Sequence, residues 1–374
     1  MFFFIFLGVM GVLNLYVYRR LFRQLHFDSI KPGLILTVAL FVLQTLFVLE
    51  ARSSFLPESP ALYYLLSLSV GVTVILFFVT LLYDLLHTLG KRIPFDQSRR
   101  HFIKVIFDST MLVLAASYLL NGLIGGLRRP YLNSVTVDIL RFPFKSFKIA
   151  QLSDMHIGHT IGTDFVRECV ARVNAQKPDM IVLTGDIVDL PVEKIAGVLE
   201  ELRQLKSPYG TYFILGNHEY FRGPETVVAK MRELGFNVLL NESVRIGSGS
   251  KAFNLVGIND LVSRRFGAMP YDIDAAFRNV DPELPTVVLA HQPKTVELTQ
   301  ERDYNLMLSG HTHGGQIFPF GFLVMLNQTY LAGLYRIDTA KQIFVSRGTG
   351  YWGPPVRVLA PSEISLLTLR PASR

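Results

Sequence analysis

Apolar residues are distributed unevenly along this chain of 374 residues. Near the beginning they form long, almost uninterrupted runs, which are typical of helices that cross a bilayer. From about residue 147 onward the runs are short and separated by polar and glycine-containing turns, which is typical of buried strands in an α/β protein. The pattern therefore predicts a transmembrane helical region over 1–128, a linker with a first strand over 129–146, and an α/β domain over 147–374.

Four segments in the first region reach spanning length, which requires about 20 apolar residues. The fourth is the weakest, because Asp108, Ser109 and Asn121 interrupt its apolar run. Ionisable residues within spans often mark ion paths, but only Asp108 comes near a span centre, which makes a transporter a remote alternative. We expect an all-α bundle of about four transmembrane helices. The segments are Phe2–Tyr18, Gly33–Leu49, Leu62–Leu86 and Phe102–Ile124.

The net charge of +7 fits either nucleic acid or an anionic membrane surface as a partner. Much of this charge flanks the apolar segments, and no groove that combines basic and aromatic residues is legible in the sequence. We therefore expect the bilayer as a partner and expect no nucleic acid. No feature of the sequence predicts a protein partner.

The basic residues between the spans predict the orientation, since cytoplasmic loops are enriched in Lys and Arg. The first and third connections are rich in them, whereas the second has only Arg52. This predicts a multi-pass protein of the cell (inner) membrane whose globular domain is extracytoplasmic. Arg128 and Arg129 oppose this orientation, but long translocated domains escape the rule. The residues counted are Arg19, Arg20, Arg23 and Lys31 in the first connection and Lys91, Arg92, Arg99, Arg100 and Lys104 in the third.

Downstream, strand-like runs alternate with amphipathic helical segments. This alternation predicts a largely parallel or mixed sheet with helices on its faces. The predicted helices cover Thr163–Gln176 with Thr163 as N-cap, then Val192–Leu205, then a helix that begins at Pro224. Beyond Tyr330, shorter runs predict a closing antiparallel group. The predicted strands are Phe147–Leu152, Met180–Leu183, Thr211–Leu215, Val287–Ala290, Leu306–Leu308, Gln342–Ser346 and Ile364–Leu369.

Five consecutive strand ends carry Asp, Asn or His side chains. The most conspicuous pair is His311 and His313, whose spacing of two places both imidazoles on one side if the backbone stays extended. A single strand-end aspartate or histidine is usually structural, but five successive strand ends of this kind favour a functional site, since open α/β sheets keep their chemistry there. The residues are Asp154, His156, Asp186, Asn217, His218, His291, His311 and His313.

The chemistry of these residues favours metal binding. Oxygen and imidazole ligands without thiolate suit Mn²⁺, Fe or Zn²⁺. The single cysteine, Cys169, excludes an internal disulfide and a cysteine-rich metal site. Seven candidate ligands are too many for one tetrahedral ion but fit two ions that share a carboxylate, for which Asp186 is central in chain order. Two such ions polarise a phosphoryl oxygen and lower the pKa of a water.

The spaced blocks also resemble a known family, the calcineurin-like metallophosphoesterases, over about Phe147–Leu369. The GHTHGGQ motif of Gly310–Gln316 and the later Ser346–Gly350 resemble the YkuE/YaeI-like branch, here with an N-terminal multi-span membrane region. The resemblance implies a four-layer α/β/β/α sandwich and a dinuclear metal site. It is carried by Asp154-x-His156, Gly185-Asp186, Gly216-Asn217-His218-Glu219, His291 and Gly310-His311-Thr312-His313.

The same resemblance implies a role for each motif residue. His218 takes the catalytic position beside the substrate phosphate, with Glu219 as its orienting carboxylate and Asp186 bridging the two metals. One metal takes Asp154, His156, Asp186 and His313, and the other takes Asp186, Asn217, His291 and His311.

We therefore expect a membrane-anchored phosphoesterase that hydrolyses a phosphoester, phosphodiester or pyrophosphate bond through metal-bound hydroxide. The alternative is a membrane receptor or scaffold whose phosphoesterase fold binds a phosphorylated ligand without turnover. The substrate is a phosphorylated small molecule or a lipid. Candidate phosphate contacts are Arg347, in a glycine-rich loop, and Arg264 with Arg265, which are equally typical of solvated surface charge.

The apolar run Ile317–Leu326 directly follows the histidine motif. The simpler interpretation is a buried strand or loop core. The alternative is a lip that dips into the bilayer and admits a lipid headgroup.

Overall fold

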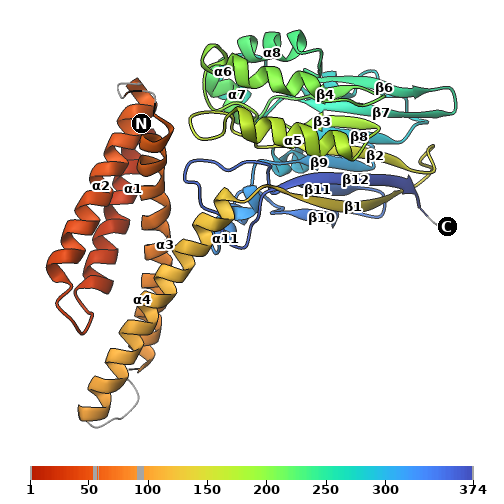
Figure 1. Cartoon of the computed structure of the whole chain (residues 1–374). Coiled ribbons are helices and arrows are strands. Elements are labelled where there is room, and N and C mark those ends of the chain that lie inside the picture. Colours follow the sequence, from red (N-terminus) through yellow and green to blue (C-terminus); the bar gives the residue numbers. More distant parts are fainter. Residues whose placement is uncertain (1, 54–56, 58, 91–96, 373–374) are drawn as a thin grey trace. The chain divides into compact units, whose positions relative to one another are not determined.

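The computed structural model describes residues 2–53, 57, 59–90 and 97–372. The chain forms two compact units, one made of 1–127 with 353–358 and the other of 128–352 with 359–374 (Figure 1). The division is not a single cut in the sequence, because a short segment near the end of the chain belongs with the helices. Lys91 and Arg92, which entered the orientation argument, lie outside the described residues.

The first unit consists of helices. Among the described residues, four helices are long and apolar enough to cross a membrane. Each contains one of the four predicted segments, so the prediction of four apolar helices is confirmed. The elements are α1 (Phe2–Val17) with its π-helical extension η1 (Tyr18–Phe22), α2 (Ile30–Ser53), α3 (Pro60–Gly90) and α4 (Gln97–Leu127).

Buried polar side chains connect these helices. Asn14 of α1 donates to Gln44 of α2 at 2.9 Å, and Gln44 donates to Thr73 of α3 at 2.7 Å. Asp108 of α4, though fully buried, is paired with Lys104 at 2.9 Å and accepts from the Tyr83 hydroxyl at 3.0 Å. Ionisable and polar groups inside a bilayer need such partners. These hydrogen bonds and ion pairs are enough to explain why the polar residues are buried among the helices. An ion path is not required to explain them.

The segment 353–358 packs on the glycines of α3 and α4. The backbone N–H of Arg357 donates to the carbonyl of Gly122 at 2.9 Å. A methyl group at Gly125 would overlap the Arg357 carbonyl oxygen, and one at Gly126 would overlap that of Pro355. Small residues are typical of such close backbone approach against a membrane helix. The composition of the last two turns of α4 therefore matches this contact.

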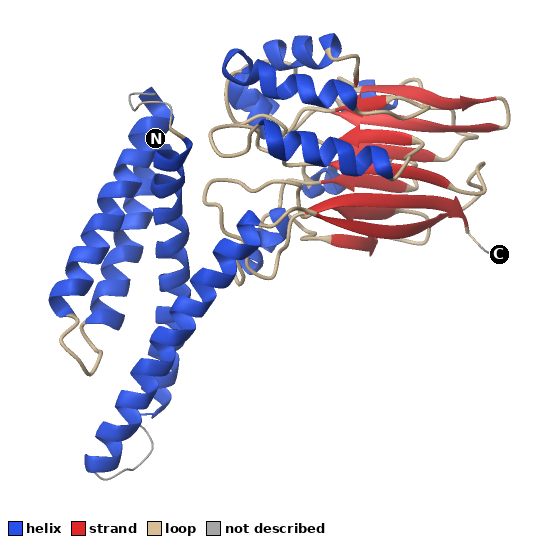
Figure 2. Cartoon of the chain, viewed as in Figure 1, coloured by secondary structure: helices blue, strands red, loops and turns tan. Residues whose placement is uncertain are grey.

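The second unit contains two six-stranded sheets (Figure 2). In the first sheet the order is β1-β12-β2-β3-β4-β5, and in the second it is β10-β11-β9-β8-β7-β6. Most neighbours are parallel, but β12 runs antiparallel to β2, β6 to β7, and β10 to β11. The strands are β1 (Tyr131–Ile139), β2 (Phe147–Leu152), β3 (Met180–Leu183), β4 (Thr211–Phe213), β5 (Asn237–Val238), β6 (Glu242–Ser248), β7 (Lys251–Ile258), β8 (Thr286–Ala290), β9 (Leu306–Ser309), β10 (Gly333–Arg336), β11 (Gln342–Val345) and β12 (Glu363–Pro371).

Helices flank the two sheets, which gives four layers. Alternation along the strands explains this: in β2, Ile149 faces the core between the sheets, while Ala150 faces the core under the outer helices. A third core covers the other face of the second sheet. The remaining helices are α5 (Thr163–Ala175), α6 (Val192–Leu199), η2 (Glu200–Gln204), α7 (Asn217–Arg222), α8 (Pro224–Glu233), α9 (Ser263–Phe266), α10 (Ile273–Phe277), η3 (Pro293–Leu298), η4 (His313–Gly315) and α11 (Gly321–Met325).

This architecture confirms the α/β/β/α sandwich and corrects three details. The last runs do not form one closing antiparallel group, because β11 joins β9 in parallel and β12 lies in the other sheet between β1 and β2. The N-cap of α5 is Gly162, not Thr163, which is already helical. The second predicted helix changes from α-helix to a 3₁₀ turn at Glu200. The strand placements depend on pairing with strands far away in the sequence, which local patterns do not report.

Candidate metal centre

The eight strand-end residues lie where the carboxyl ends of strands from both sheets meet. β2, β3 and β4 of the first sheet lead to Asp154, His156, Asp186, Asn217 and His218, and β8 and β9 of the second lead to His291, His311 and His313. The chain order suggested one sheet, whereas the site lies between two. Backbone hydrogen bonds connect the loops: the N–H of His156 donates to the Asp186 carbonyl at 3.1 Å, and that of Gly310 donates to the His291 carbonyl at 2.9 Å.

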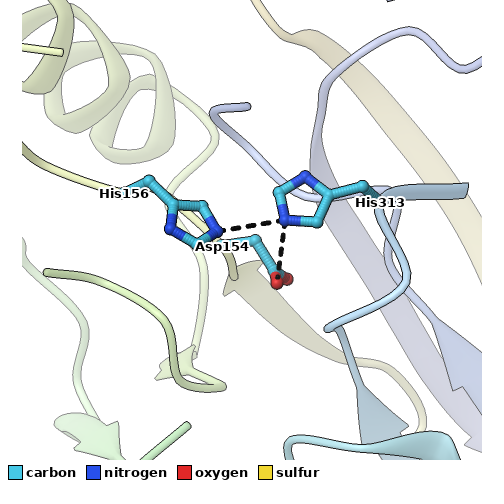
Figure 3. A group of neighbouring side chains, drawn as sticks. All are labelled: Asp154, His156 and His313. Carbon is cyan, nitrogen blue, oxygen red and sulfur yellow. Dashed lines mark hydrogen bonds and ion pairs between the residues drawn. The ribbon is translucent and has the colours of Figure 1, made fainter. Parts of the chain in front are cut away.

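Asp154, His156 and His313 form a first cluster (Figure 3). Nε2 of His156 lies 3.0 Å from Nε2 of His313, and the latter lies 3.4 Å from Oδ1 of Asp154. All three residues are buried. Two ring nitrogens and a carboxylate oxygen thus point at one small volume.

Asp186, His291 and His311 form a second cluster, which Asn217 joins. Nε2 of His291 lies 3.2 Å from Oδ2 of Asp186 and 3.2 Å from Oδ1 of Asn217. The other ring nitrogen of His291 contacts the Thr184 carbonyl at 2.8 Å. A carbonyl accepts only from N–H, so this contact holds a proton at Nδ1 and fixes Nε2 as the atom that faces the cluster.

Both clusters have the donor set of a cation site. Burial lowers the pKa of His291, but the Asp186 carboxylate outweighs this and raises it well above the ordinary value. The Asp186 carboxylate therefore places negative charge beside Nε2 of His291. Nitrogen and oxygen ligands of this kind suit Mn²⁺, Fe or Zn²⁺. The residues present fit a pair of divalent ions.

Asp186 lies against members of both clusters. Its Oδ2 is 3.9 Å from Nε2 of His156 and 3.2 Å from Nε2 of His291, while Oδ1 accepts the backbone N–H of His218 at 2.8 Å. Burial raises the pKa of Asp186, but the positive charges on His291 and His218 hold it well below its usual range. The carboxylate is therefore ionised and placed as a shared ligand requires.

The backbone at these positions is strained. Asp154, His156, Asp186, His311 and His313 all have φ between 51° and 70°. For residues with a side chain, this left-handed conformation costs roughly 1–2 kcal/mol each. Clusters of such residues are typical of functional sites. The finding also corrects the assumption of an extended backbone at His311 and His313, whose side chains enter different clusters.

His218 lies beside the clusters and is held by a residue that sequence reasoning missed. Nδ1 of His218 contacts Oδ1 of Asp189 at 2.6 Å, and Nε2 lies 3.9 Å from Oδ2 of Asp186. Burial lowers the pKa of His218, but Asp186 and Asp189 raise it to about 9. The available signal was the spacing Gly185-Asp186-x-x-Asp189, which puts a second carboxylate on the same loop.

Glu219 has partners other than the His218 ring it was expected to orient. Its carboxylate is fully buried and accepts backbone N–H groups of the loop after β3 and of the turn before α7. The distances run from 2.7 to 3.2 Å, and the donors are Asp186, Ile187, Val188 and Gly216. Glu219 therefore shapes the loop that presents Asp186, while Asp189 contacts the imidazole.

The three arginines expected to bind phosphate have other surroundings. Arg347 donates to Glu363 and to the Tyr131 hydroxyl, both at 3.0 Å. Its stem packs on Gly314, beside the candidate ligand His313. Arg264 stacks on Tyr271 at 4.2 Å and lines a separate surface hollow of about 550 Å³, and Arg265 is exposed on the same short helix. Of these three arginines, only Arg347 lies beside the loop that carries the candidate ligand His313.

The apolar run after the histidine motif is not a buried strand. It forms a turn and the short helix α11, and most of its large side chains are exposed. Phe322 is 65% and Leu326 84% exposed, whereas Ile317 and Gly321 are buried. The simpler interpretation from sequence is therefore wrong, and an exposed apolar surface adjoins the ligand loop.

Comparison with known proteins agrees with this geometry. Residues 147–315 match the family model of the calcineurin-like phosphoesterases. An uncharacterized metallophosphoesterase of Campylobacter jejuni is 34% identical over 98% of this chain and 97% of its own length. The chain belongs to the calcineurin-like metallophosphoesterases.

Two further relatives place this metallophosphoesterase within the family. A zebrafish (Danio rerio) transmembrane protein with metallophosphoesterase domain is 33% identical over 82% of this chain and 74% of its own length. The uncharacterized metallophosphoesterase YkuE of Bacillus subtilis is 32% identical over 73% of this chain and 98% of its own length. The predicted resemblance to the YkuE-like branch with membrane helices is thereby confirmed, and we treat the metallophosphoesterase as a membrane protein.

Proposed function

We propose that the protein is a dinuclear-metal hydrolase of phosphodiester or pyrophosphate bonds that works at a membrane. The observation that carries this proposal is the position of Asp186 against members of two ligand clusters at once. Asp154, His156, Asp186 and His313 would hold one ion, and Asp186, Asn217, His291 and His311 the other. When bound, such ions polarise a phosphoryl oxygen and lower the pKa of a water.

The protein's own residues supply the remaining chemistry. Asp189 accepts from Nδ1 of His218, so the opposite nitrogen, Nε2, faces the centre. From there His218 donates a hydrogen bond to a phosphoryl oxygen and delivers the proton that the leaving oxygen needs. Glu219 holds the Asp186 loop through backbone N–H groups. The first cluster is buried, as are Asp186 and His291 of the second, which strengthens the charge interactions there, while the half-buried His311 and Asn217 lie on the side open to solvent.

Purified full-length protein, loaded with Mn²⁺ or Zn²⁺, tests the proposal with bis(p-nitrophenyl) phosphate. We expect Asp186→Asn and His311→Ala to abolish turnover and to lower bound metal. Asp164→Asn is the matched control, since that side chain is 99% exposed on α5. Unchanged turnover in Asp186→Asn would overturn the proposal. If the metal-loaded wild-type protein bound phosphorylated ligands but did not hydrolyse them, the protein would instead be a receptor or scaffold.

We further propose that the protein is a multi-pass protein of the cell membrane with an extracytoplasmic catalytic domain. Contacts within the helical unit support this. Lys104 of α4 donates to the Gln24 carbonyl at 2.5 Å, and the His26 N–H donates to Asp108 at 2.6 Å. The basic first connection and the basic start of α4 therefore share one end, as the positive-inside rule requires. Protease added to intact spheroplasts should cleave the catalytic domain, and full protection would reverse the orientation.

A further inference from the structure

An exposed apolar surface lies directly on the metal-ligand loop. Residues 318–326 present six large apolar side chains to solvent, and a soluble surface rarely gathers so many in so short a segment. The rings of Phe318 and Phe322 contact each other at 5.9 Å, so they form one patch. The other exposed apolar side chains of the segment are Phe320, Leu323, Met325 and Leu326.

This patch is fixed rigidly to the metal centre. Gly315 ends the 3₁₀ turn that begins at the ligand His313, and Gly321 begins α11. Their backbones pack so closely that a methyl group on Gly315 would overlap the Gly321 Cα. Gly315 also has φ of 79°, which favours glycine. The patch and His313 therefore move as one body.

Trp352 extends the apolar surface toward His218. Gln316 makes two hydrogen bonds of 2.9 Å with the Trp352 backbone, one to its carbonyl and one from its N–H. The indole is half-exposed, and its ring lies 6.1 Å from that of His218. Phe221 lies 5.4 Å from the same imidazole on another side. Exposed aromatic rings thus border the side of the site where the substrate phosphate would bind.

The chain that follows Trp352 continues directly into the helical unit. After Trp352 the chain contributes 353–358 to the helical unit, where these residues pack on Gly122, Gly125 and Gly126 of α4. This contact lies in the last two turns of that candidate span. From the end of α4, only Arg128, Arg129 and Pro130 lead to β1, which is about 10 Å of extended chain. Two short covalent connections therefore join the phosphoesterase unit to the membrane helices, and Trp352 is the residue at one of them.

We propose that the apolar rim, defined as Phe318, Phe320, Phe322, Leu323, Leu326 and Trp352, enters the bilayer that the helices cross. The substrate is then a membrane lipid with a phosphodiester or pyrophosphate headgroup. Its headgroup enters the catalytic site while its acyl chains stay in the bilayer. Trp is typical of the membrane interface, and aromatic and leucine side chains on a short helix bind there. The substrate class rests on the proposed function, whereas the insertion of the rim does not.

Trp352 is the only tryptophan, so its fluorescence tests the insertion directly. The full-length protein is placed in nanodiscs of phosphatidylcholine, either plain or brominated on the acyl chains near the headgroup. We expect the brominated lipid to quench most of the emission and aqueous iodide to quench little. Full quenching by iodide and none by brominated lipid would overturn the proposal. This readout needs no catalysis, so it stands even if the proposed hydrolysis fails.

Two substrates with the same leaving group test the lipid preference in the same nanodiscs. They are dioleoylphosphatidyl-p-nitrophenol, which resides in the bilayer, and soluble bis(p-nitrophenyl) phosphate. We expect Phe322→Ser with Leu326→Ser to lower turnover of the lipid about tenfold or more and to leave the soluble diester unchanged. Leu140→Ser is the matched control, since that side chain is 64% exposed at the far end of β1.

Equal losses on both substrates, or none, would overturn the lipid substrate. If the rim instead bound a partner protein, iodide would quench the Trp352 emission in nanodiscs without that partner. The serine variants would then keep the wild-type preference for the lipid substrate. If the wild-type protein hydrolysed neither substrate, the proposed function and the proposed lipid substrate would both be wrong. The Trp352 fluorescence would still show whether the rim inserts into the bilayer.

Discussion

Oδ1 of Asp189 lies 2.6 Å from Nδ1 of His218, and this contact decides which ring nitrogen faces the metal centre. The loop that carries Asp189 is itself fixed, because its backbone N–H donates to the Ile157 carbonyl at 2.9 Å. A short bridge between Ile157 and Val188 holds the loops after β2 and β3 side by side. The two strand ends thus position the catalytic candidate jointly with the ligands.

We expect Asp189→Asn to lower kcat by about 10- to 100-fold, because an amide holds the imidazole less firmly and does not stabilise its protonated form. Bound metal, measured by elemental analysis, should stay unchanged if Asp189 only positions His218. Because Asp189 raises the pKa of His218, its loss should also move the alkaline limb of the kcat pH profile to lower pH. A purely structural role would not cause this shift. Metal loss in this variant would instead assign Asp189 as a ligand, together with His156 and His218.

Glu219 should act on stability more than on chemistry. Its carboxylate accepts backbone N–H groups from two loops, and the amide of Glu219→Gln would turn a donor toward these donors. Losing charge-assisted hydrogen bonds at a buried site costs about 1.5–3 kcal/mol. Thermal unfolding of the metal-free variant should show this loss. Equal stability of variant and wild type would contradict the account, and Glu283→Gln in the exposed loop before β8 is the control.

Much of the fold was predictable because buried strands leave a strong local signal. β2 and β3 were predicted at their observed bounds, since Ile149 and Ala150 face different apolar cores, four of the six residues of β2 are apolar, and all four of β3 are. The five strand ends were predictable for the same reason. The order of strands was not, because β12 reaches across the whole domain to lie between β1 and β2. No local sequence pattern near Glu363 predicts that β12 pairs with β1 and β2.

The details of the site needed the structure. A carboxylate three residues after Asp186 is common as a helix cap, so Asp189 carried no distinct signal until its contact with His218 was seen. The run Ile317–Leu326 has the composition of a core strand, and composition alone cannot tell burial from exposure. The left-handed backbone at His311 likewise separates two neighbouring histidines in a way that spacing does not indicate.

Removing the metals should destabilise the catalytic domain. Ligands that bind only the folded state add about 2.7 kcal/mol when present at a hundredfold excess over Kd. We expect chelation by EDTA to lower the unfolding temperature and abolish turnover, and Mn²⁺ or Zn²⁺ to restore both. Asp186→Asn, which loses the shared ligand, should respond much less to added metal. An equal response in that variant would place the ions elsewhere.

Cys169 should be inert in the folded protein. Burial within the α5 core raises the pKa of its thiol to about 12, so thiolate is about one part in ten thousand at pH 8. The thiolate is the reactive form. Maleimide should therefore leave native protein unlabelled and modify one thiol per chain after denaturation. Rapid labelling of the native protein would show that α5 opens.

The contact between residues 353–358 and α4 predicts opposite outcomes for two glycine substitutions. Gly125→Ala would drive a methyl group into the Arg357 carbonyl oxygen and should destabilise the full-length protein by about 1–3 kcal/mol. Gly8→Ala in α1 has open space around the added methyl group and should be neutral.

Trp352 directly precedes residues 353–358. Its fluorescence during thermal unfolding in detergent therefore reports locally when the contact between that segment and α4 is lost. Gly125→Ala should shift that transition to lower temperature, whereas Gly8→Ala should leave it in place. If Gly125→Ala unfolds like wild type, residues 353–358 do not pack against α4.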